Sequence, residues 1–558
     1  MAVTSTYPIV QPRAEDLIIG TQTYTEENPV IGNPTRNFTV ESLVSFVESN
    51  TGVNKIIAGQ GLTVSPSNGK GDVTISAPTA PQWLTSDAVV TNGVVNYISN
   101  LLIPTGSTSI GDYAFLNMNI DAIDFNNQAI TSIGTSAFSI NKLKGTLTLP
   151  STLLTIGDYA FQDYITITNK IELIEFGNQL TTIGSYAFYK NAITSLSIPS
   201  SVTTIDGHAF KQQGDNLGTR TLASLTFEPR TTALTISNNA FEYNAITSVN
   251  IPANTVLGYY SFGFDTAMSS VTIGDNCTLG QTSFYNNKNI SSLTIGDNVS
   301  FLGSNVFGFD AAYPDFLTSV NIPSTTTFGS GYTFSNRRSL TTFTVANGAN
   351  SFWPQTINLG VAPDGIFLGC GLTEVNIDSN VTVGVAAFSG NLLTSISIGS
   401  NATLQSSAFS SNPLTSISIG EGVTLGPNAF GYNSGIISTL TIPGTTIFVT
   451  NSSNSGAFLN NGVGSITNLI IEEGITVIPR YYFYRQGIES IVLPSTIVEI
   501  GEFAFNRSNI SGTLTFASVI SIGSSAFREN PGITTVNVPI GSIVSGAAFD
   551  AGVTINYV

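Results

Sequence analysis

The sequence predicts a mainly β fold: a solenoid of about 19 coils over residues 91–558, preceded by a small region with a helix and a β-hairpin. Three features of the sequence indicate this fold. A Phe repeatedly follows a Gly-x-x segment and a small residue, as in IGDYAF, IGSYAF and IGEFAF. A short alternating segment lies between successive rings, for example ITSLSIP at 193–199 and LTSISIG at 393–399 and 414–420. Turn-forming Pro, Gly, Asp, Ser or Asn residues then follow.

The recurring Phe sets the length of one coil. Most intervals between these rings are 21 to 23 residues. A unit of this length cannot bury its apolar side alone, whereas stacked copies share one continuous core. The alternating spacing places Ile193, Leu196 and Ile198 close to one face, so each coil should supply one half-buried strand. The predicted repeat core includes Phe115, Phe138, Phe161, Phe188, Phe210, Phe388, Phe409, Phe430, Phe505 and Phe527.

The repeated pattern is Leu-Thr-Ser-(Leu/Ile)-x-Ile-Pro-x-x-Val-Thr-x-Ile-Gly-x-x-Ala-Phe. It resembles the BspA-like leucine-rich-repeat family, and the resemblance covers residues 100–558. Many copies carry both the strand and the Gly-x-x-Ala-Phe segment. The resemblance implies a leucine-rich-repeat solenoid that acts as a protein-binding or surface-binding scaffold, often an adhesin. It identifies no ligand.

The chain is acidic and contains few charged residues. Lys and Arg total 18 against 35 for Asp and Glu, a formal charge of -17, with no dense basic cluster. A phosphate backbone would be repelled, so the sequence excludes nucleic acid as a partner. No stretch of about 18 apolar residues occurs, so no membrane insertion is expected. The first residues, MAVTSTYPIVQPRAEDL, contain no basic segment followed by an apolar one, which predicts synthesis in a host cytoplasm without a signal peptide.

The region before the solenoid divides into two predicted segments. Residues 1–53 form an anchoring segment with a short amphipathic helix, which Thr39 can cap. Residues 54–90 form a small β module, with strands at Leu62–Val64 and Val73–Ile75 around an Asn-Gly turn. An isolated short helix and an isolated hairpin are both marginal in water. Association of three chains through this region would stabilise them.

Both segments resemble the leaders of tailed-bacteriophage virion and fibre proteins. The resemblance is carried by Asn-Pro-Thr-Arg-Asn-Phe-Thr-Val at 33–40, by Ala-Gly-x-Gly-Leu-Thr-Val at 58–64 and by Gly-Asp-Val-Thr-Ile-Ser at 71–76. It implies a location in the virion, other virion proteins as partners of the N-terminus, and a homotrimer. The candidate anchoring residues are Asn33, Pro34, Arg36, Phe38, Val40, Leu43, Val44 and Val47.

Few residues suit catalysis or metal binding. The single His, His208, occupies the position that Tyr113, Tyr159 and Tyr186 fill in sibling coils, which favours a structural role over a catalytic triad. The carboxylate pairs 172/175, 472/473 and 499/502 are of a type that supports glycoside hydrolysis, but such residues usually lie on solvated turns. Asp at 275, 297 and 378 recurs after strands and suits either calcium or turn capping. We therefore predict no catalytic residues, no metal site, no cofactor and no enzymatic activity.

Coils that are longer than average mark candidate binding loops, because extra residues in a solenoid form loops at its surface. Phe352 and Trp353 lie in the longest of these, at 346–365, and either anchor a sugar or protein partner or fill a gap in the core. Tyr313 lies in the 310–316 loop. Arg337 and Arg338 stand out in a chain with few cations, and suit either an acidic glycan or a solvated edge. These five residues are the candidate receptor-binding residues.

The function that this organisation favours is a bacteriophage fibre or fibre-like appendage. Its solenoid would recognise a host cell-surface protein or glycan. The main alternative is a cellular BspA-like surface adhesin, which needs an export route and an attachment that neither the N-terminus nor the final GVTINYV indicates. A third and weaker alternative is a polysaccharide depolymerase.

Overall fold

The computed structural model describes the chain from residue 98 onward, with gaps at 164–169, 215–218, 311–314, 324, 330, 348–350, 355, 358–360, 363, 450–455 and 460–465. Before residue 98 it describes only the strands β1 (Thr63–Ser65), β2 (Thr74–Ser76), β3 (Val89–Thr91) and β4 (Val94–Tyr97). The predicted amphipathic helix and the eight candidate anchoring residues lie outside the described residues. Contacts divide the chain into two compact units, Met1–Ile246 and Thr247–Val558.

The predicted hairpin is present, with each strand displaced by one residue. β1 pairs antiparallel with β2, and Thr63 lies opposite Ser76. A second antiparallel pair, β3 with β4, follows it. The boundary that we expected between residues 90 and 91 therefore falls inside β3. The first bridge of the parallel type joins Ile98 to Ile120.

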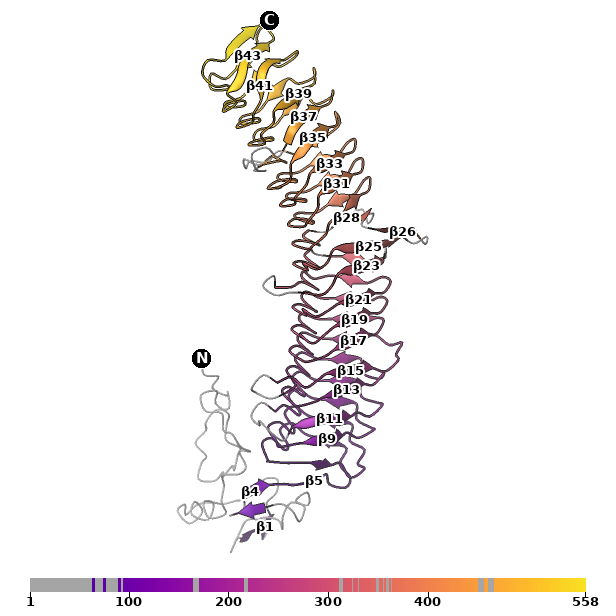
Figure 1. Ribbon diagram of the computed structural model, residues 1–558. Coiled ribbons are helices and arrows are strands. Elements are labelled where there is room, and N and C mark those ends of the chain that lie inside the picture. The colour runs from indigo at the N-terminus through magenta and orange to yellow at the C-terminus, as the bar shows by residue number, and fades with distance from the viewer. Residues whose placement is uncertain are drawn as a thin grey trace, which may run out of the picture. The chain divides into compact units, whose positions relative to one another are not determined.

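The first unit contains two columns of parallel strands, with one strand of each column per coil (Figure 1). The longer strands are β9 (Gly145–Thr148), β11 (Ile171–Glu175), β13 (Ser195–Ile198) and β15 (Ser224–Phe227). The shorter ones are β6 (Ser109–Ile110), β8 (Ser132–Ile133), β10 (Thr155–Ile156), β12 (Thr182–Ile183), β14 (Thr204–Ile205) and β16 (Leu234–Ile236). β5 (Leu101–Leu102) pairs with β7 (Ile123–Asp124) at the start of the solenoid.

The second unit repeats the same two columns, broken into several sheets. The first column contains β17 (Ser248–Ile251), β19 (Ser270–Ile273), β21 (Ser292–Ile295), β23 (Ser319–Pro323), β25 (Thr342–Asn347), β27 (Thr356–Ile357), β29 (Asn376–Ile377), β31 (Ser395–Ile398), β33 (Ser416–Ile419), β35 (Ile437–Ile442), β37 (Ile466–Ile471), β39 (Ser490–Val492), β41 (Ser511–Thr515), β43 (Gly532–Val538) and β45 (Thr554–Tyr557). The second column contains β18 (Thr255–Leu257), β20 (Thr278–Leu279), β22 (Ser300–Phe301), β24 (Thr327–Phe328), β28 (Val361–Ala362), β30 (Thr382–Val383), β32 (Thr403–Leu404), β34 (Thr424–Leu425), β36 (Ile447–Phe448), β38 (Val477–Ile478), β40 (Glu499–Ile500), β42 (Ser521–Ile522) and β44 (Ile543–Val544). One antiparallel strand, β26 (Ser351–Pro354), pairs with β25.

The prediction of a β-solenoid of about 19 turns is confirmed. The described residues contain no helix, so strands and turns alone build each coil. In β13 the serines face solvent and Leu196 and Ile198 are buried, as the alternation predicted. The strand register places polar residues opposite polar ones and apolar residues opposite apolar ones, because Ser195 lies opposite Ser224 and Ile198 opposite Phe227. Each coil thus covers the apolar side of its neighbour.

The recurring Phe residues form the centre of the core, and all ten predicted core rings are buried. Within the first unit, successive rings from Phe115 to Phe241 stack with centroids 5.2–5.3 Å apart and planes within 10° of parallel. Rings from Phe262 to Phe549 also stack in the second unit, with centroids 5.1–5.8 Å apart and planes within 26° of parallel. The coil spacing is therefore close to one ring-stacking distance throughout each unit.

The Gly of the Gly-x-x-Ala-Phe segment is needed for this close stacking. A Cβ added at Gly157 would lie 2.7 Å from the carbonyl carbon of Gly134 in the preceding coil. Real Cβ atoms do not approach backbone so closely, so a side chain here would force the two coils apart.

Candidate binding surface

A column of buried amides, which the sequence analysis missed, holds the coils in register. It lies three residues after the core Phe. Asn412 shows the pattern: its Nδ2 donates to the carbonyl oxygens of Phe388 and Phe409 at 3.0 and 3.1 Å, and its Oδ1 accepts from the Leu393 amide at 3.2 Å. The signal was present as a recurring Phe-x-x-Asn. The amide column comprises Asn141, Asn191, Gln213 and Asn244 in the first unit and Asn287, Asn391, Asn412, Asn433, Gln486 and Asn530 in the second.

Arg337 belongs to this interior position, so the prediction that it contacts a receptor is wrong. Its side chain is 0% exposed. Nε donates to the Phe307 carbonyl at 2.8 Å and Nη2 to the Asn287 carbonyl at 3.1 Å, which replaces the amide of a typical coil. Burial lowers the pKa of Arg337 to about 10, and nearby Asp315 partly opposes that shift. The residue follows Phe334 by three positions, and that spacing was the available signal.

The other candidate receptor-binding residues have different outcomes. Arg338 is exposed, unlike its neighbour. Phe352 and Trp353 lie on β26, where they pair across to Ala346 and Val345 of β25, so the long coil forms an antiparallel hairpin instead of an irregular loop. Their side chains, and the whole of Tyr313, lie outside the described residues. Arg338, Phe352, Trp353 and Tyr313 stay predictions.

A second column of side chains reaches the surface of the first unit two residues before each of its first five core Phe residues, from Phe115 to Phe210. We call Tyr113, Ser136, Tyr159, Tyr186 and His208 the surface column. All five have left-handed backbone, with φ between +52° and +61°. Each donates its amide hydrogen to a carbonyl of the next coil at 2.7–3.0 Å. Because backbone and hydrogen bond repeat, the Cα–Cβ bonds leave each coil in the same direction.

Side chains in the surface column stack on one another. The rings of Tyr159 and Tyr186 are 5.0 Å apart and 7° from parallel, and those of Tyr186 and His208 are 4.3 Å apart and 3° from parallel. Tyr189 packs edge-on against Tyr186 at 5.3 Å. The structural interpretation of His208 thus agrees with its contacts. Burial lowers the pKa of His208, with Lys211 acting in the same direction and Glu242 opposing it, which favours the neutral imidazole.

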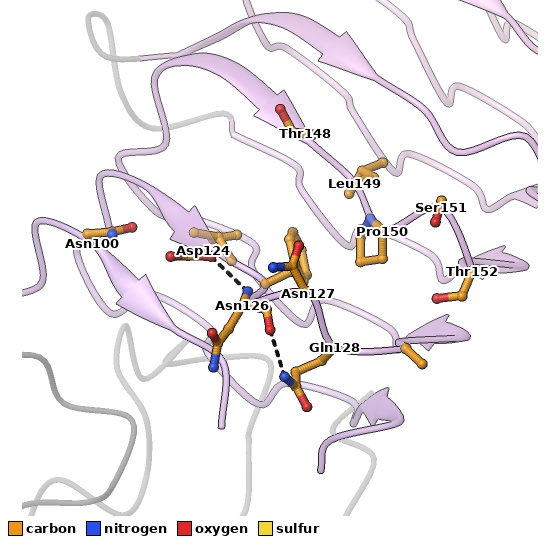
Figure 2. A pocket seen from close by; sticks show the side chains of 13 residues that line it. Asn100, Asp124, Asn126, Asn127, Gln128, Thr148, Leu149, Pro150, Ser151 and Thr152 are labelled. Atoms are coloured by element: carbon orange, nitrogen blue, oxygen red, sulfur yellow. Dashed lines mark hydrogen bonds between the residues drawn. The ribbon is translucent and has the colours of Figure 1, made fainter. Parts of the chain in front are cut away.

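A polar recess of about 620 Å³ opens near the start of the solenoid (Figure 2). Two successive turns line it, at 123–129 and 148–152, together with Asn100. The Asp124 carboxylate accepts from the Asn126 amide at 2.7 Å, and the Gln128 side chain donates to the Asn126 carbonyl at 2.7 Å. Amides and hydroxyls beside Leu149 and Pro150 are the mixture of groups that suits a hydroxyl-rich ligand.

One member of each carboxylate pair contacts a neighbouring coil, as Glu175 does with the Thr148 hydroxyl at 2.8 Å and Glu502 with Arg480 at 3.3 Å. Glu473 accepts from the backbone and hydroxyl of Ser495 at 2.9 and 3.0 Å, and these bonds lower its pKa. A glycosidase acid requires the opposite shift. Asp275 accepts from the Asp297 amide at 2.8 Å, as a turn-capping residue would. Among the described residues, no group of three or more His, Cys, Asp or Glu is placed to hold a metal ion. That part of the chain also contains no helix long and apolar enough to cross a membrane.

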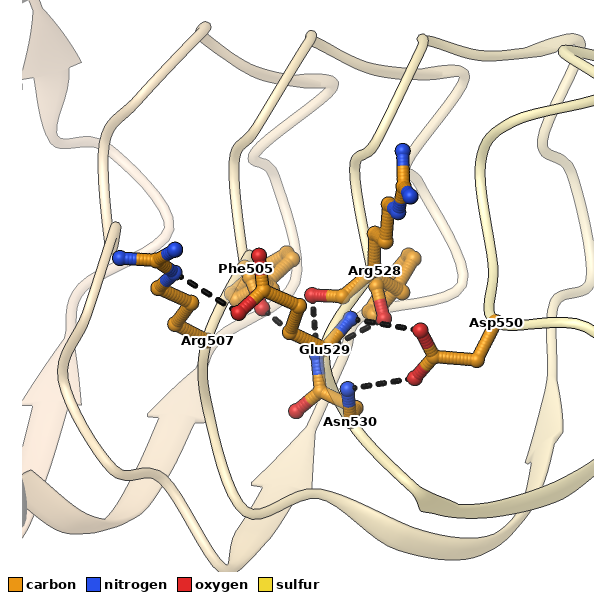
Figure 3. Close-up of polar contacts among 7 residues, drawn as sticks. Phe505, Arg507, Arg528, Glu529, Asn530 and Asp550 are labelled. Atoms are coloured by element: carbon orange, nitrogen blue, oxygen red, sulfur yellow. Dashed lines mark hydrogen bonds and ion pairs between the residues drawn. The ribbon is translucent and has the colours of Figure 1, made fainter.

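Asp550 closes the amide column at the last coil (Figure 3). Its two carboxylate oxygens accept from the backbone amides of Glu529 and Asn530 at 2.9 and 2.8 Å. In earlier coils, the equivalent of the Asn530 amide donates to the amide oxygen of the following coil, as Asn412 does to Asn433 at 2.7 Å. The Glu529 side chain also pairs with Arg507 at 2.8 Å. A carboxylate therefore satisfies amides that would otherwise be unpaired at this end.

Stacked parallel coils, a phenylalanine core and a buried amide column define a β-solenoid repeat protein. A family model described as "BspA type Leucine rich repeat region" matches residues 95–216, 234–358, 358–458 and 451–556, with six copies. This chain belongs to the BspA-type leucine-rich-repeat family.

Several solved structures of bacterial proteins are similar to this chain. The chain is similar to a leucine-rich repeat protein from Bacteroides ovatus, at 14% identity over 90% of this chain and 99% of that one, with a TM-score of 0.29. It is also similar to the pneumococcal vaccine antigen PcpA, at 14% identity over 80% of this chain and 94% of that one, with a TM-score of 0.33. A leucine-rich cell surface protein from Faecalibacterium prausnitzii aligns at 18% identity over 73% and 93%, with a TM-score of 0.23. A comparison with curated proteins finds no match.

Proposed function

We propose that this protein attaches to a cell surface through its leucine-rich-repeat solenoid and performs no chemistry on what it binds. The observation that carries the proposal is the BspA-type repeat, which extends over most of the chain. Stacked coils place equivalent side chains in columns, so the solenoid offers an extended, rigid interaction surface. Its partner is a host cell-surface protein or glycan. The recess at 123–129 and 148–152 and the surface column are the parts of the first unit with the most distinctive chemistry.

Binding of the labelled full chain to intact bacterial cells tests this proposal. We expect saturable binding that excess unlabelled chain displaces. Treating the cells with protease or with periodate then separates a protein receptor from a glycan. Binding no greater than that of an unrelated protein of similar net charge would contradict the proposal.

The biological setting that we favour for this binding solenoid is the bacteriophage virion. The support is the likeness of residues 33–40, 58–64 and 71–76 to the leaders of virion and fibre proteins. In this setting the N-terminus contacts other virion proteins and the solenoid recognises the host. Electron microscopy of intact particles with an antibody to this chain should show label, and unlabelled particles would end this part of the proposal.

Trimerisation through residues 1–90 is a separate part of the proposal. The full chain has a mass of 58.6 kDa, so a homotrimer should give three times that value by light scattering. A chain beginning near Thr91 should be monomeric. A monomeric full chain would remove the trimer and leave the binding function untouched.

A cellular surface adhesin is the alternative setting, and the BspA-type repeat favours it because adhesins are common in that family. Detection of the protein on bacterial cells that carry no phage, made from a longer precursor with a cleaved export signal, would favour this setting over the virion.

A further inference from the structure

Within the surface column, one residue carries no ring. Asn239, two residues before Phe241, also carries none, but it lies beyond the last ring of the column, that of His208. Tyr113, Tyr159, Tyr186 and His208 each carry a ring, and Ser136 lies between the first two. Tyr113 is 58% exposed and Tyr159 is 37% exposed, so both are accessible to a partner. Ser136 shares the left-handed backbone of its neighbours, and its amide donates to the Asp158 carbonyl at 2.7 Å. The serine therefore interrupts the rings without interrupting the coils.

The interruption leaves room for one flat group. Core rings of these three coils follow each other at 5.2 and 5.3 Å, so equivalent atoms of the first and third coils lie about 10 Å apart. Tyr159 and Tyr186 stack at 5.0 Å, which shows that the surface column accommodates one ring per coil. A group that enters above Ser136 would lie about 5 Å from each tyrosine, within the roughly 6 Å over which a cation is attracted to a ring face.

The rim of this gap is acidic. Asp112 and Asp158 directly precede the two tyrosines, and each has one carboxylate oxygen fixed at 2.7 Å from a backbone amide of the next coil, that of Thr135 or Ser185. The three turn segments 111–117, 134–140 and 157–163 contain neither Lys nor Arg, and their third Asp, Asp163, is buried, so Asp112 and Asp158 supply the charge of the rim. The gap thus combines two aromatic faces with a negative rim, an arrangement complementary to a planar cation.

We propose that Tyr113, Ser136 and Tyr159 form a slot for the guanidinium group of an arginine side chain on a partner protein. The inference rests on the proposed binding function and names the chemistry of one contact. The protein already places cations over tyrosines at similar distances, with Lys190 5.4 Å from the Tyr189 ring and Arg480 5.4 Å from the Tyr481 ring. A neutral sugar ring would also fill the space, but the carboxylate rim favours the cation.

The test fills the slot with the ring that the column lacks. Ser136→Tyr should fold, because Tyr occupies the same backbone conformation in the neighbouring coils. Ser407→Tyr is the matched control: Ser407 holds the equivalent position in the second unit, with φ +59°, and the equivalent neighbours there are Ala386 and Asn428. Melting curves establish that both variants of the full chain are folded.

The probes are acetyl-Gly-Arg-Gly-amide and the same peptide with citrulline, titrated at low salt and followed by NMR. We expect the arginine peptide to bind the unmodified chain and the Ser407→Tyr variant equally, and at least tenfold more weakly to Ser136→Tyr. Asp112→Asn together with Asp158→Asn should weaken it severalfold while keeping the acceptors for the backbone amides. The citrulline peptide, which is flat but neutral, should bind at least tenfold more weakly than the arginine peptide.

Three results would overturn the slot. These are equal binding of the two peptides, undiminished binding to Ser136→Tyr, or preference for a neutral methyl glucoside that Ser136→Tyr abolishes. Cell binding separates the two proposals. If unmodified and Ser136→Tyr chains bind cells equally well, the slot is not the contact and the adhesive function stands. If the chain binds the arginine peptide but no cells, the slot stands and the adhesive function fails.

Discussion

Replacing Asn412 with Leu tests whether the amide column stabilises the solenoid. Asn412 is 1% exposed. The change keeps the size of the side chain and removes its hydrogen bonds. The Phe388 carbonyl retains the bond from Asn391 at 3.0 Å, but the Phe409 carbonyl and the Leu393 amide lose the bonds that Asn412 supplies.

The magnitude follows from these two losses. Each of the two buried polar groups left without a partner costs about 1–3 kcal/mol, and burying the apolar Leu side chain returns about 1.5–3 kcal/mol. We therefore expect the free energy of unfolding to fall by about 1–3 kcal/mol. Because each coil contacts only its neighbours, the loss should be concentrated in the coils around Asn412.

Urea unfolding followed by circular dichroism measures the total loss in free energy of unfolding. Hydrogen exchange of peptides covering 388–412 shows which coils are destabilised. Asn468→Leu is the control, since Asn468 makes one exposed hydrogen bond, to the Ser438 carbonyl at 2.8 Å, and should change stability by under about 1 kcal/mol. If the free energies of unfolding of the two variants agree to within about 0.5 kcal/mol, the buried amides do not hold these coils in register.

Three further predictions concern other parts of the solenoid. Phe188→Ala removes a buried ring that stacks on both sides, and should lower the free energy of unfolding by about 3–5 kcal/mol in urea; a loss under about 1 kcal/mol would contradict the ring-stacked core. Asp550→Ala removes the acceptors for the Glu529 and Asn530 amides, and should speed hydrogen exchange in the last coils only; unchanged exchange there would show that Asp550 is no cap. Burial lowers the pKa of His208, so as the pH drops below the unfolded-state value of about 6.5, the unfolded chain binds the proton before the folded chain does. The free energy of unfolding should therefore decrease as the pH decreases. Because the chain has one His, a single NMR titration checks this, His208→Tyr should remove the dependence, and a measured pKa at or above about 6.5 would refute it.

The coils and their core rings could be predicted because the information is local and repeated. Every coil carries its own Phe, its alternating strand and its turn, so counting residues was sufficient to place Phe188 and Phe409 in the interior. The hairpin before the solenoid was predicted within one residue for the same reason, since an Asn-Gly turn and its flanking strands are adjacent in sequence.

Arg337 was misplaced because its charge suggested the surface. Charged residues are rarely fully buried, and the exception here depends on carbonyl acceptors contributed by Phe307 and Asn287, which are 30 and 50 residues away. The amide column was overlooked for a related reason. An Asn after a turn suits a solvated turn as well as a buried ladder, and only the stack of coils decides between them.

The sequence by itself determined the period, the β-solenoid and the BspA-type repeat, because one short pattern, copied many times, has to bury its apolar side against its own copies. The tertiary structure decided which residues of neighbouring coils lie next to each other. It placed Asn412 within hydrogen-bond distance of two phenylalanine carbonyls and Arg337 in the interior of the solenoid. It also placed Ser136 between two exposed tyrosines. Those arrangements depend on which residues of different coils meet across a spacing of about 5 Å, and a single coil read alone does not contain that information.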